Sequence, residues 1–388
     1  MASKITRNYL PELFALGFIR SKPSMVTVNL TEQCNQQCIY CEIGIGRTSS
    51  IKNALTINDM IWIIDEMASN GIHKISLCGG EPFLFDGLMD VVDYAGQNKI
   101  RCSITSNGMT AHKLTKTDLG ILKDWKAEIN ISIDAFDDEI QSITRGKTGT
   151  LSNALKSIQC FKESRIPVTV LTVISKYNYH NLYDLVTKAY EEGIREILFQ
   201  PVNYSSNYPD RVVVDNKNQL NVGVDNLDAL MGQLKKILQF ERRHKINTNV
   251  YRIMPWIGHY LKSAADPKGN SFFNNVLPKF FCREVYAIID INYNGGIQPC
   301  GLRPATISIK DDKQPGLLSL WMQATKEIRN DLESGMFYKE CNTCCHHFSR
   351  NMLASMIKYP LENRKTWMNM IPLLLTRTGS RMLKKLYL

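Results

Sequence analysis

Three cysteines near the start of the chain are close enough in sequence to share one metal centre. Cys34, Cys38 and Cys41 follow the spacing C-x3-C-x2-C. Thiolates at this spacing can hold three irons of a 4Fe–4S cube and leave the fourth iron without a protein ligand. Such an open iron can bind a small molecule and pass an electron to it. A zinc knuckle or a structural cluster is the competing interpretation, but zinc normally takes four closing ligands, and no fourth lies nearby.

A second set of four cysteines lies far downstream and comprises Cys282, Cys300, Cys341 and Cys344. The spacings C-x17-C and C-x2-C suit a four-cysteine zinc ribbon as well as a second iron–sulfur cluster. Cys345 competes with Cys344 for the last position, and the C-x2-C spacing favours Cys344. His346 and His347 are further candidate ligands. If all four ligands are cysteines, a cluster here has no open iron and relays electrons or shapes the pocket.

The composition is typical of a water-soluble globular protein. The 388 residues are 44% apolar and 22% charged, which suits one large domain and a smaller one. The eleven cysteines are odd in number and no secretory signal precedes them, so metal ligation is favoured over disulfides. No stretch reaches the roughly 18 apolar residues of a membrane span. We therefore expect a cytoplasmic protein.

The positive charge is concentrated at the C-terminus. The chain carries a net charge of +10, and residues 350–388 contain eight lysines and arginines against one acid. The rest is therefore close to neutral, which speaks against a nucleic-acid partner. Within Trp367–Leu388 apolar and basic residues are interleaved, as in a helix that lies at the inner face of a membrane. The alternative is a helix that packs on the body of the protein.

The segments that must position these residues alternate between strand and helix. Val- and Ile-rich runs predict strands over Met25–Leu30, Lys74–Cys78, Arg101–Thr105, Glu128–Ile133, Pro167–Val173 and Glu196–Gln200. Helical patterns between them include Thr56–Asn70, Leu114–Lys126, Leu151–Ser164 and Tyr179–Glu192. Six βα units predict an α/β fold, with a parallel sheet curled into a full or partial barrel. The first cysteines follow the first strand, at the end where such folds place active sites.

The chain divides into four parts by these patterns. Residues 1–24 form an N-terminal segment, and 25–222 form the barrel domain, which ends in a polar loop over Pro201–Val222. Residues 223–348 comprise a helix over Val224–His244 and a small α+β domain with the second cysteines. There, strand-like Tyr286–Tyr293 and the turn Asn294-Gly295-Gly296 predict a β-hairpin. The basic helical tail occupies 349–388.

Several motifs downstream of the triad give a family resemblance over about residues 25–205. They are Gly79-Gly80-Glu81-Pro82 after the second strand, Thr105-Ser-Asn107-Gly108 after the third, and Ser132-Ile-Asp134 with Thr144-Arg145-Gly146 after the fourth. With the triad, this set resembles the radical S-adenosylmethionine (SAM) enzymes, a family with a six-unit partial barrel. Ala135 stands where the family usually has glycine, which is a mild departure.

The resemblance implies SAM and an open 4Fe–4S cluster as cofactors. It makes Cys34, Cys38 and Cys41 the catalytic cluster ligands, and it implies a 5′-deoxyadenosyl radical that abstracts hydrogen from an unactivated C–H bond. The glycine turn with Glu81 and Pro82 would receive the SAM amino group. Asn107 would face the barrel mouth. The remaining cofactor-binding residues are Ser132 and Arg145, which would approach the SAM carboxylate and ribose, Asp134 of the same motif, and Gln200 on the adenine side.

The second cysteine set resembles the auxiliary domain called SPASM, in its shorter form called twitch. This likeness implies one auxiliary 4Fe–4S cluster on Cys282, Cys300, Cys341 and Cys344, and the chemistry requires an external electron donor of the flavodoxin or ferredoxin type. No further cysteine follows Cys345, so the shorter form fits better than the two-cluster form.

The substrate is the open part of this interpretation. About 24 residues precede the first strand, which is short for the leader-binding domain of peptide maturases. We therefore expect a small-molecule, sugar or lipid-linked substrate, with peptide modification as the alternative. A non-catalytic iron–sulfur or zinc scaffold is the alternative of another class. The triad together with Glu81, Ser132 and Arg145 speaks against it, because a scaffold needs none of them.

Overall fold

A computed structural model describes most of the chain. The described ranges are 22–41, 43, 54–202, 220–265, 280–311, 313 and 315–336, with single positions from 338 to 368. The N-terminal segment up to residue 21, most of the loop predicted over 201–222 and most of the basic tail lie outside the described residues. So do Cys345, His346 and His347.

Six parallel strands form the barrel wall, as predicted. They are β1 Met25–Thr31, β2 Lys74–Gly79, β3 Arg101–Ser106, β4 Glu128–Ser132, β5 Val168–Ile174 and β6 Glu196–Pro201. Each strand pairs in parallel with the next along the chain. Their bounds lie within one or two residues of the predicted ones, because buried parallel strands carry dense β-branched residues. The α/β fold class is confirmed.

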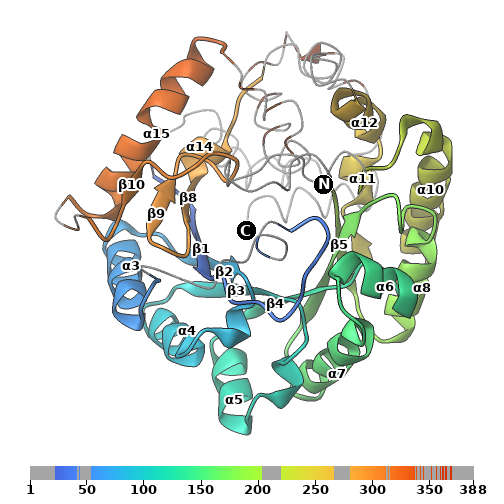
Figure 1. The fold of residues 1–388 in the computed structure, drawn as a ribbon, viewed down its shortest axis with the longest axis horizontal. Helices are drawn as coiled ribbons and strands as arrows, with labels where there is room; N and C mark the ends of the chain where they lie inside the picture. Colours follow the sequence, from blue (N-terminus) through green and yellow to red (C-terminus); the bar gives the residue numbers. More distant parts are fainter. Residues whose placement is uncertain are drawn as a thin grey trace, which may run out of the picture.

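Helices cover the outside of this wall (Figure 1). They are α3 Ile57–Asn70, α4 Leu88–Gln97, α5 Lys116–Asp124, α6 Asp138–Arg145, α7 Thr150–Glu163, α8 Leu182–Glu191 and α10 Leu227–Arg243. Short helices are η1 Pro82–Leu84, η2 Ala111–Lys113, η4 Val224–Asn226, α11 Val250–Ile253, α12 Ile257–Ala265 and α14 Glu284–Ala287. Along the barrel strands, buried side chains alternate with more exposed ones, and the buried side chains lie on one face of the sheet under the helices. In β1, Val26 and Val28 are fully buried, whereas Thr27 and Asn29 are half-buried on the other face.

The sheet continues beyond the six strands at both edges. Its order is β10-β9-β8-β1-β2-β3-β4-β5-β6-β7. The additional strands are β7 Asn247–Thr248, β8 Ile288–Ile291, β9 Gly296–Gln298 and β10 Ile307–Ser308. β8 pairs in parallel with β1, and β9 and β10 follow as antiparallel strands. The predicted hairpin is therefore present, and it is joined directly to the first barrel strand.

Two salt bridges at one carboxylate also connect the barrel to the segment that follows the hairpin. Helix α15 Leu317–Glu333 lies on the outside near α3 and the hairpin (Figure 1). Asp59 at the start of α3 accepts from Lys310 at 3.2 Å and from Lys313 at 2.9 Å. Burial alone raises the pKa of Asp59, but hydrogen bonds from Lys313 and Thr56 outweigh burial and hold it well below its usual range.

No helix in the described part of the chain is long and apolar enough to cross a bilayer.

Candidate active site

The first three cysteines lie in the loop that follows β1. Cys38 is buried, Cys34 and Cys41 are partly exposed, and all three are free thiols. Burial raises the pKa of Cys38 to about 12. The charge of Arg145 lowers this pKa, while the charges of Cys41 and Cys34 raise it further. A buried thiol such as Cys38 forms a thiolate readily only with a cation to bind.

Within the described ranges, no group of three or more His, Cys, Asp or Glu side chains is arranged to hold a metal ion. A 4Fe–4S cube places different demands on its ligands than a single ion does, because each thiolate binds a different iron. The donor set of three thiols in one short loop fits such a cube in its chemistry.

The glycine turn after β2 supports this loop from one side. Gly80 N donates to Thr31 O at 2.6 Å, and Glu81 N donates to Gln33 O at 2.7 Å. A Cβ on Gly80 would overlap the carbonyl oxygen of Gln33. The backbones therefore approach at a distance that only glycine allows, which is the physical reason for glycine in this motif.

Glu81, predicted to help receive the SAM amino group, points into the protein. Its side chain is fully buried, and it accepts from Ser106 Oγ and Asn107 N, each at 2.7 Å. Phe83 N donates to the same carboxylate at 3.2 Å. Burial raises the pKa of Glu81, and the hydrogen bonds from Asn107 and Ser106 oppose this rise. Glu81 thus connects the ends of β2 and β3, and the adjacent Pro82 begins η1.

Asn107 connects the end of β3 to the cysteine loop. Its Nδ2 donates to Asn35 Oδ1 at 2.7 Å and lies 3.6 Å from Cys34 Sγ. Its Oδ1 accepts from Met109 N at 2.9 Å, which fixes the orientation of the amide. Asn107 therefore reaches the loop itself and donates an N–H to one of the candidate cluster ligands.

Asp134 and Arg145 form a buried pair next to the loop. Arg145 Nη2 donates to Asp134 Oδ1 at 2.8 Å, and Tyr40 donates its hydroxyl to the other oxygen. Asp134 is fully buried and Arg145 is 6% exposed. The two residues predicted to lie near SAM therefore bind each other. Arg145 Nε is buried and has no hydrogen-bond partner among the described residues, and although burial lowers the pKa of Arg145, the charges of Asp134 and Cys38 both raise it.

The end of α6 supports the loop from the opposite side. Gln37 N donates to Arg145 O at 3.2 Å, and Ile39 N donates to Thr144 O at 3.1 Å. Gly146 ends the helix with a φ of +64°, and a Cβ there would overlap the carbonyl oxygen of Gln37. Sequence reasoning missed this role of Gly146, although a glycine directly after a helix is a common helix end.

The remaining predicted residues lie at the same ends of the strands. Ser132 is the last residue of β4 and is half-buried, and Gln200 is exposed near the end of β6. Ala135 has no positive φ, and the backbone N–H groups of Asp134 and Ala135 donate to Gln141 Oε1 at 2.8 and 3.2 Å. Alanine in place of the usual glycine therefore imposes no backbone strain here.

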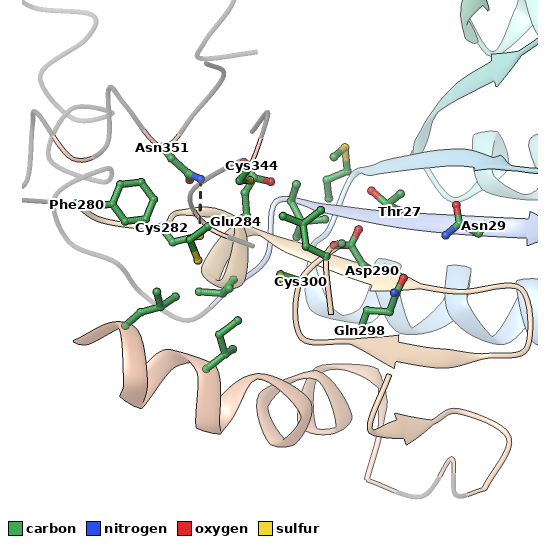
Figure 2. Close-up of a pocket in the computed structure, with 18 residues that line it drawn as sticks. Thr27, Asn29, Phe280, Cys282, Glu284, Asp290, Gln298, Cys300, Cys344 and Asn351 are labelled. Carbon is green, nitrogen blue, oxygen red and sulfur yellow. Dashed lines mark hydrogen bonds between the residues drawn. The ribbon is translucent and has the colours of Figure 1, made fainter. Parts of the chain in front are cut away.

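The four downstream cysteines line one cavity of about 380 Å³ (Figure 2). Burial raises the pKa of Cys282 well above its usual value, and Glu284, Cys341 and Cys300 raise it further. Cys344 is buried, and its N–H donates to Cys341 O at 3.4 Å. The lining also includes the polar residues Thr27, Asn29, Asp290 and Gln298. The cavity also includes Asn351, which lies beyond the predicted domain boundary and which sequence reasoning missed.

Comparisons with known proteins agree with this geometry. Residues 28–189 match the family model of the radical SAM superfamily. GTP 3′,8-cyclase of Clostridium perfringens (strain SM101 / Type A) is 26% identical over 325 residues, which cover 80% of this chain and 89% of the cyclase. Antilisterial bacteriocin subtilosin biosynthesis protein AlbA of Bacillus subtilis (strain 168) is 23% identical over 289 residues, 74% of this chain and 57% of AlbA.

Among solved structures, Streptococcus suis SuiB bound to S-adenosylmethionine has a similar fold. The TM-score is 0.60 at 19% sequence identity, and the match covers 84% of this chain and 72% of SuiB.

Proposed function

This chain carries a radical SAM domain, a domain of enzymes, and from this premise we propose that it cleaves S-adenosylmethionine reductively at a cluster on Cys34, Cys38 and Cys41. When bound, such a cluster supplies the electron that breaks a C–S bond of SAM and so yields a carbon radical able to abstract hydrogen. The observation that carries the proposal is the position of the three thiols, in one loop held by the glycine turn on one side and by α6 on the other.

The protein's own groups divide into ligands of SAM and supports of the loop. We assign the SAM amino group to the backbone carbonyls of the Gly79–Gly80 turn, because the Glu81 carboxylate is occupied by protein donors. Arg145, a guanidinium beside the cysteine loop, and Ser132 are assigned to the carboxylate and ribose. Gln200 is assigned to the adenine side. Glu81 and Asp134 hold neighbouring groups in place.

The downstream cavity is the proposed site of an auxiliary 4Fe–4S cluster. Four cysteines from distant parts of the chain converge on it, and its chemistry, four thiols with no open position, suits an electron relay. An external donor of the flavodoxin or ferredoxin type would supply the electrons. A zinc ion bound by the same four cysteines is the competing occupant.

We propose a small-molecule, sugar or lipid-linked substrate. The support is the match to GTP 3′,8-cyclase, which by its name acts on GTP. The interleaved apolar and basic residues of the tail favour contact with a membrane face, which would suit a lipid-linked substrate. Peptide modification is the second candidate, because AlbA, by its name, serves bacteriocin biosynthesis.

Anaerobic reconstitution of the full chain tests the proposal. We expect about eight irons per chain and formation of 5′-deoxyadenosine from SAM in the presence of a reductant. A Cys34/Cys38/Cys41 triple-alanine variant should lose the 5′-deoxyadenosine product. Bound zinc with no SAM turnover would instead support the non-catalytic scaffold. Acceleration of SAM cleavage by nucleotides or sugars, but not by peptides, would support the substrate class.

A further inference from the structure

Asn351 reaches the downstream cavity from the part of the chain that follows the last cysteine. It is 1% exposed, and its Nδ2 lies 3.7 Å from Cys282 Sγ, as the dashed line in Figure 2 shows. Its Oδ1 accepts from Arg283 N at 2.7 Å. A backbone N–H can only donate, so the amide oxygen must face Arg283 and the NH₂ group must face the sulfur.

Further buried hydrogen bonds fix the backbone around Asn351. Ser355 Oγ accepts from Phe281 N at 2.8 Å and lies 2.7 Å from Asn351 O, to which it donates. Asn363 Nδ2 donates to Ser355 O at 3.0 Å. Ser355 and Asn363 are fully buried. Because buried polar groups are retained where they are paired, this network holds the amide in one position against the cavity.

The charges around the cavity give this N–H an electrostatic role. Glu284 and Asp290 both line the cavity, and a negative carboxylate disfavours the addition of an electron nearby. A donated N–H has the opposite effect, because its partial positive charge stabilises the more negative, reduced state. Hydrogen bonds to the sulfurs are one of the known determinants of iron–sulfur reduction potentials.

We propose that Asn351 raises the reduction potential of the second cluster by donating an N–H···S hydrogen bond to Cys282. This inference rests on the proposed function, because it requires a cluster on the four downstream cysteines. Asn351 acts through a ligand and is thus a positioning residue that offsets the two carboxylates. The same arrangement occurs at the first site, where Asn107 Nδ2 faces Cys34 Sγ.

The test is a redox titration of the second cluster alone. The full chain is reconstituted with Cys38→Ala to remove the first cluster, and the second is followed by electron paramagnetic resonance. With Asn351→Leu added, we expect the ratio of reduced to oxidised cluster at a fixed potential to fall about tenfold, the effect of one hydrogen bond to a charged group. For a one-electron couple this is a shift of about 59 mV.

Two further variants check the sign of the effect. Asn351→Asp keeps the acceptor for Arg283 but loses the N–H and adds a negative charge, so it should lower the potential at least as much. Glu284→Gln removes a carboxylate from the same cavity and should raise it. If both Asn351 variants bind iron and titrate at the parent potential, the proposal is overturned. Loss of iron from both would also overturn it, because Asn351 would then be only a structural support.

These outcomes are distinct from failure of the proposed function. A parent protein that binds zinc or nothing at the downstream cysteines would remove the second cluster itself. If the parent binds the second cluster and the Asn351 variants keep its reduction potential, only the proposed role of Asn351 is wrong.

Discussion

The two cysteine sites of this protein are assembled in opposite ways. The first takes its thiols from one loop of eight residues, and backbone groups of neighbouring strand and helix ends hold that loop. The second gathers thiols spread from Cys282 to Cys344, and a hairpin, an edge strand and buried side-chain amides bring them together. The first site therefore depends on close backbone contact, whereas the second depends on the fold of a whole sheet edge.

The largest expected effects come from removing one ligand at each site. Cys38→Ala should abolish the formation of 5′-deoxyadenosine, because three thiolates are the minimum for the open cluster. Cys300→Ala should remove about four irons yet leave SAM cleavage with an artificial reductant within a few-fold of the wild type. Iron analysis and product chromatography measure both. Loss of both clusters in either variant would show that the two sites do not assemble independently.

Two glycines with a similar backbone conformation test whether close contact with the end of α6 holds the first cysteine loop in place. Gly146 and Gly149 both have a positive φ, +64° and +70°. Only Gly146 lies against the loop, since a Cβ on Gly149 has its nearest neighbour at 3.7 Å. We expect Gly146→Ala to lower first-cluster occupancy and SAM cleavage at least tenfold. Gly149→Ala should cost only about 1–2 kcal/mol of unfolding free energy. If both variants lose the same amount of iron, the contact between Gly146 and the cysteine loop is not the cause of the loss.

The link between the barrel and the segment after the hairpin is tested at Asp59. Asp59→Asn removes the charge that Lys310 and Lys313 share, and we expect a loss of about 1–2 kcal/mol in unfolding free energy at pH 7. The pKa of Asp59 is lowered in the folded protein, so its contribution is complete above the unfolded pKa of about 3.9 and declines as the pH falls. Urea unfolding should show a gap between wild type and variant that narrows below about pH 5. A gap that widens on acidification would contradict this assignment.

The smallest expected effect concerns Ala135, which stands where the family usually has glycine. Ala135→Gly should leave SAM cleavage within about twofold and cost about 0.5–1 kcal/mol of stability, because glycine loses more backbone entropy on folding. The rate of 5′-deoxyadenosine formation and the urea midpoint measure these changes. If Ala135→Gly cleaves SAM faster than the wild type, the alanine does restrain the site, and this prediction is wrong.

The sequence predicted the barrel strands well, and it singled out the first three cysteines, because these signals are local. Buried parallel strands are dense in Val and Ile, and the triad and the glycine turn are short motifs. The burial of Glu81 and the pairing of Asp134 with Arg145 could not be predicted, since a motif names a residue but not the partner it meets.

The second cysteine site was harder to predict, because its residues meet through contacts between distant parts of the chain. The pairing of β8 with β1 joins segments far apart in the chain, and no local pattern marks it. Asn351 stood in a segment interpreted as tail, where an asparagine carries no signal of its own. Helix α6, with its role at Gly146, was also absent from the predicted elements, because it is short and largely polar.

Strand β1 has a consequence for electron transfer. Its residues Thr27 and Asn29 line the downstream cavity, and the loop at its end carries the first three cysteines. A strand cannot stretch, and Asn29 and Cys34 are separated by no more than roughly 17 Å of extended chain. Clusters bound at the two sites would therefore lie near opposite ends of one short segment, so that the reach of a few residues limits the distance an electron must cross between them.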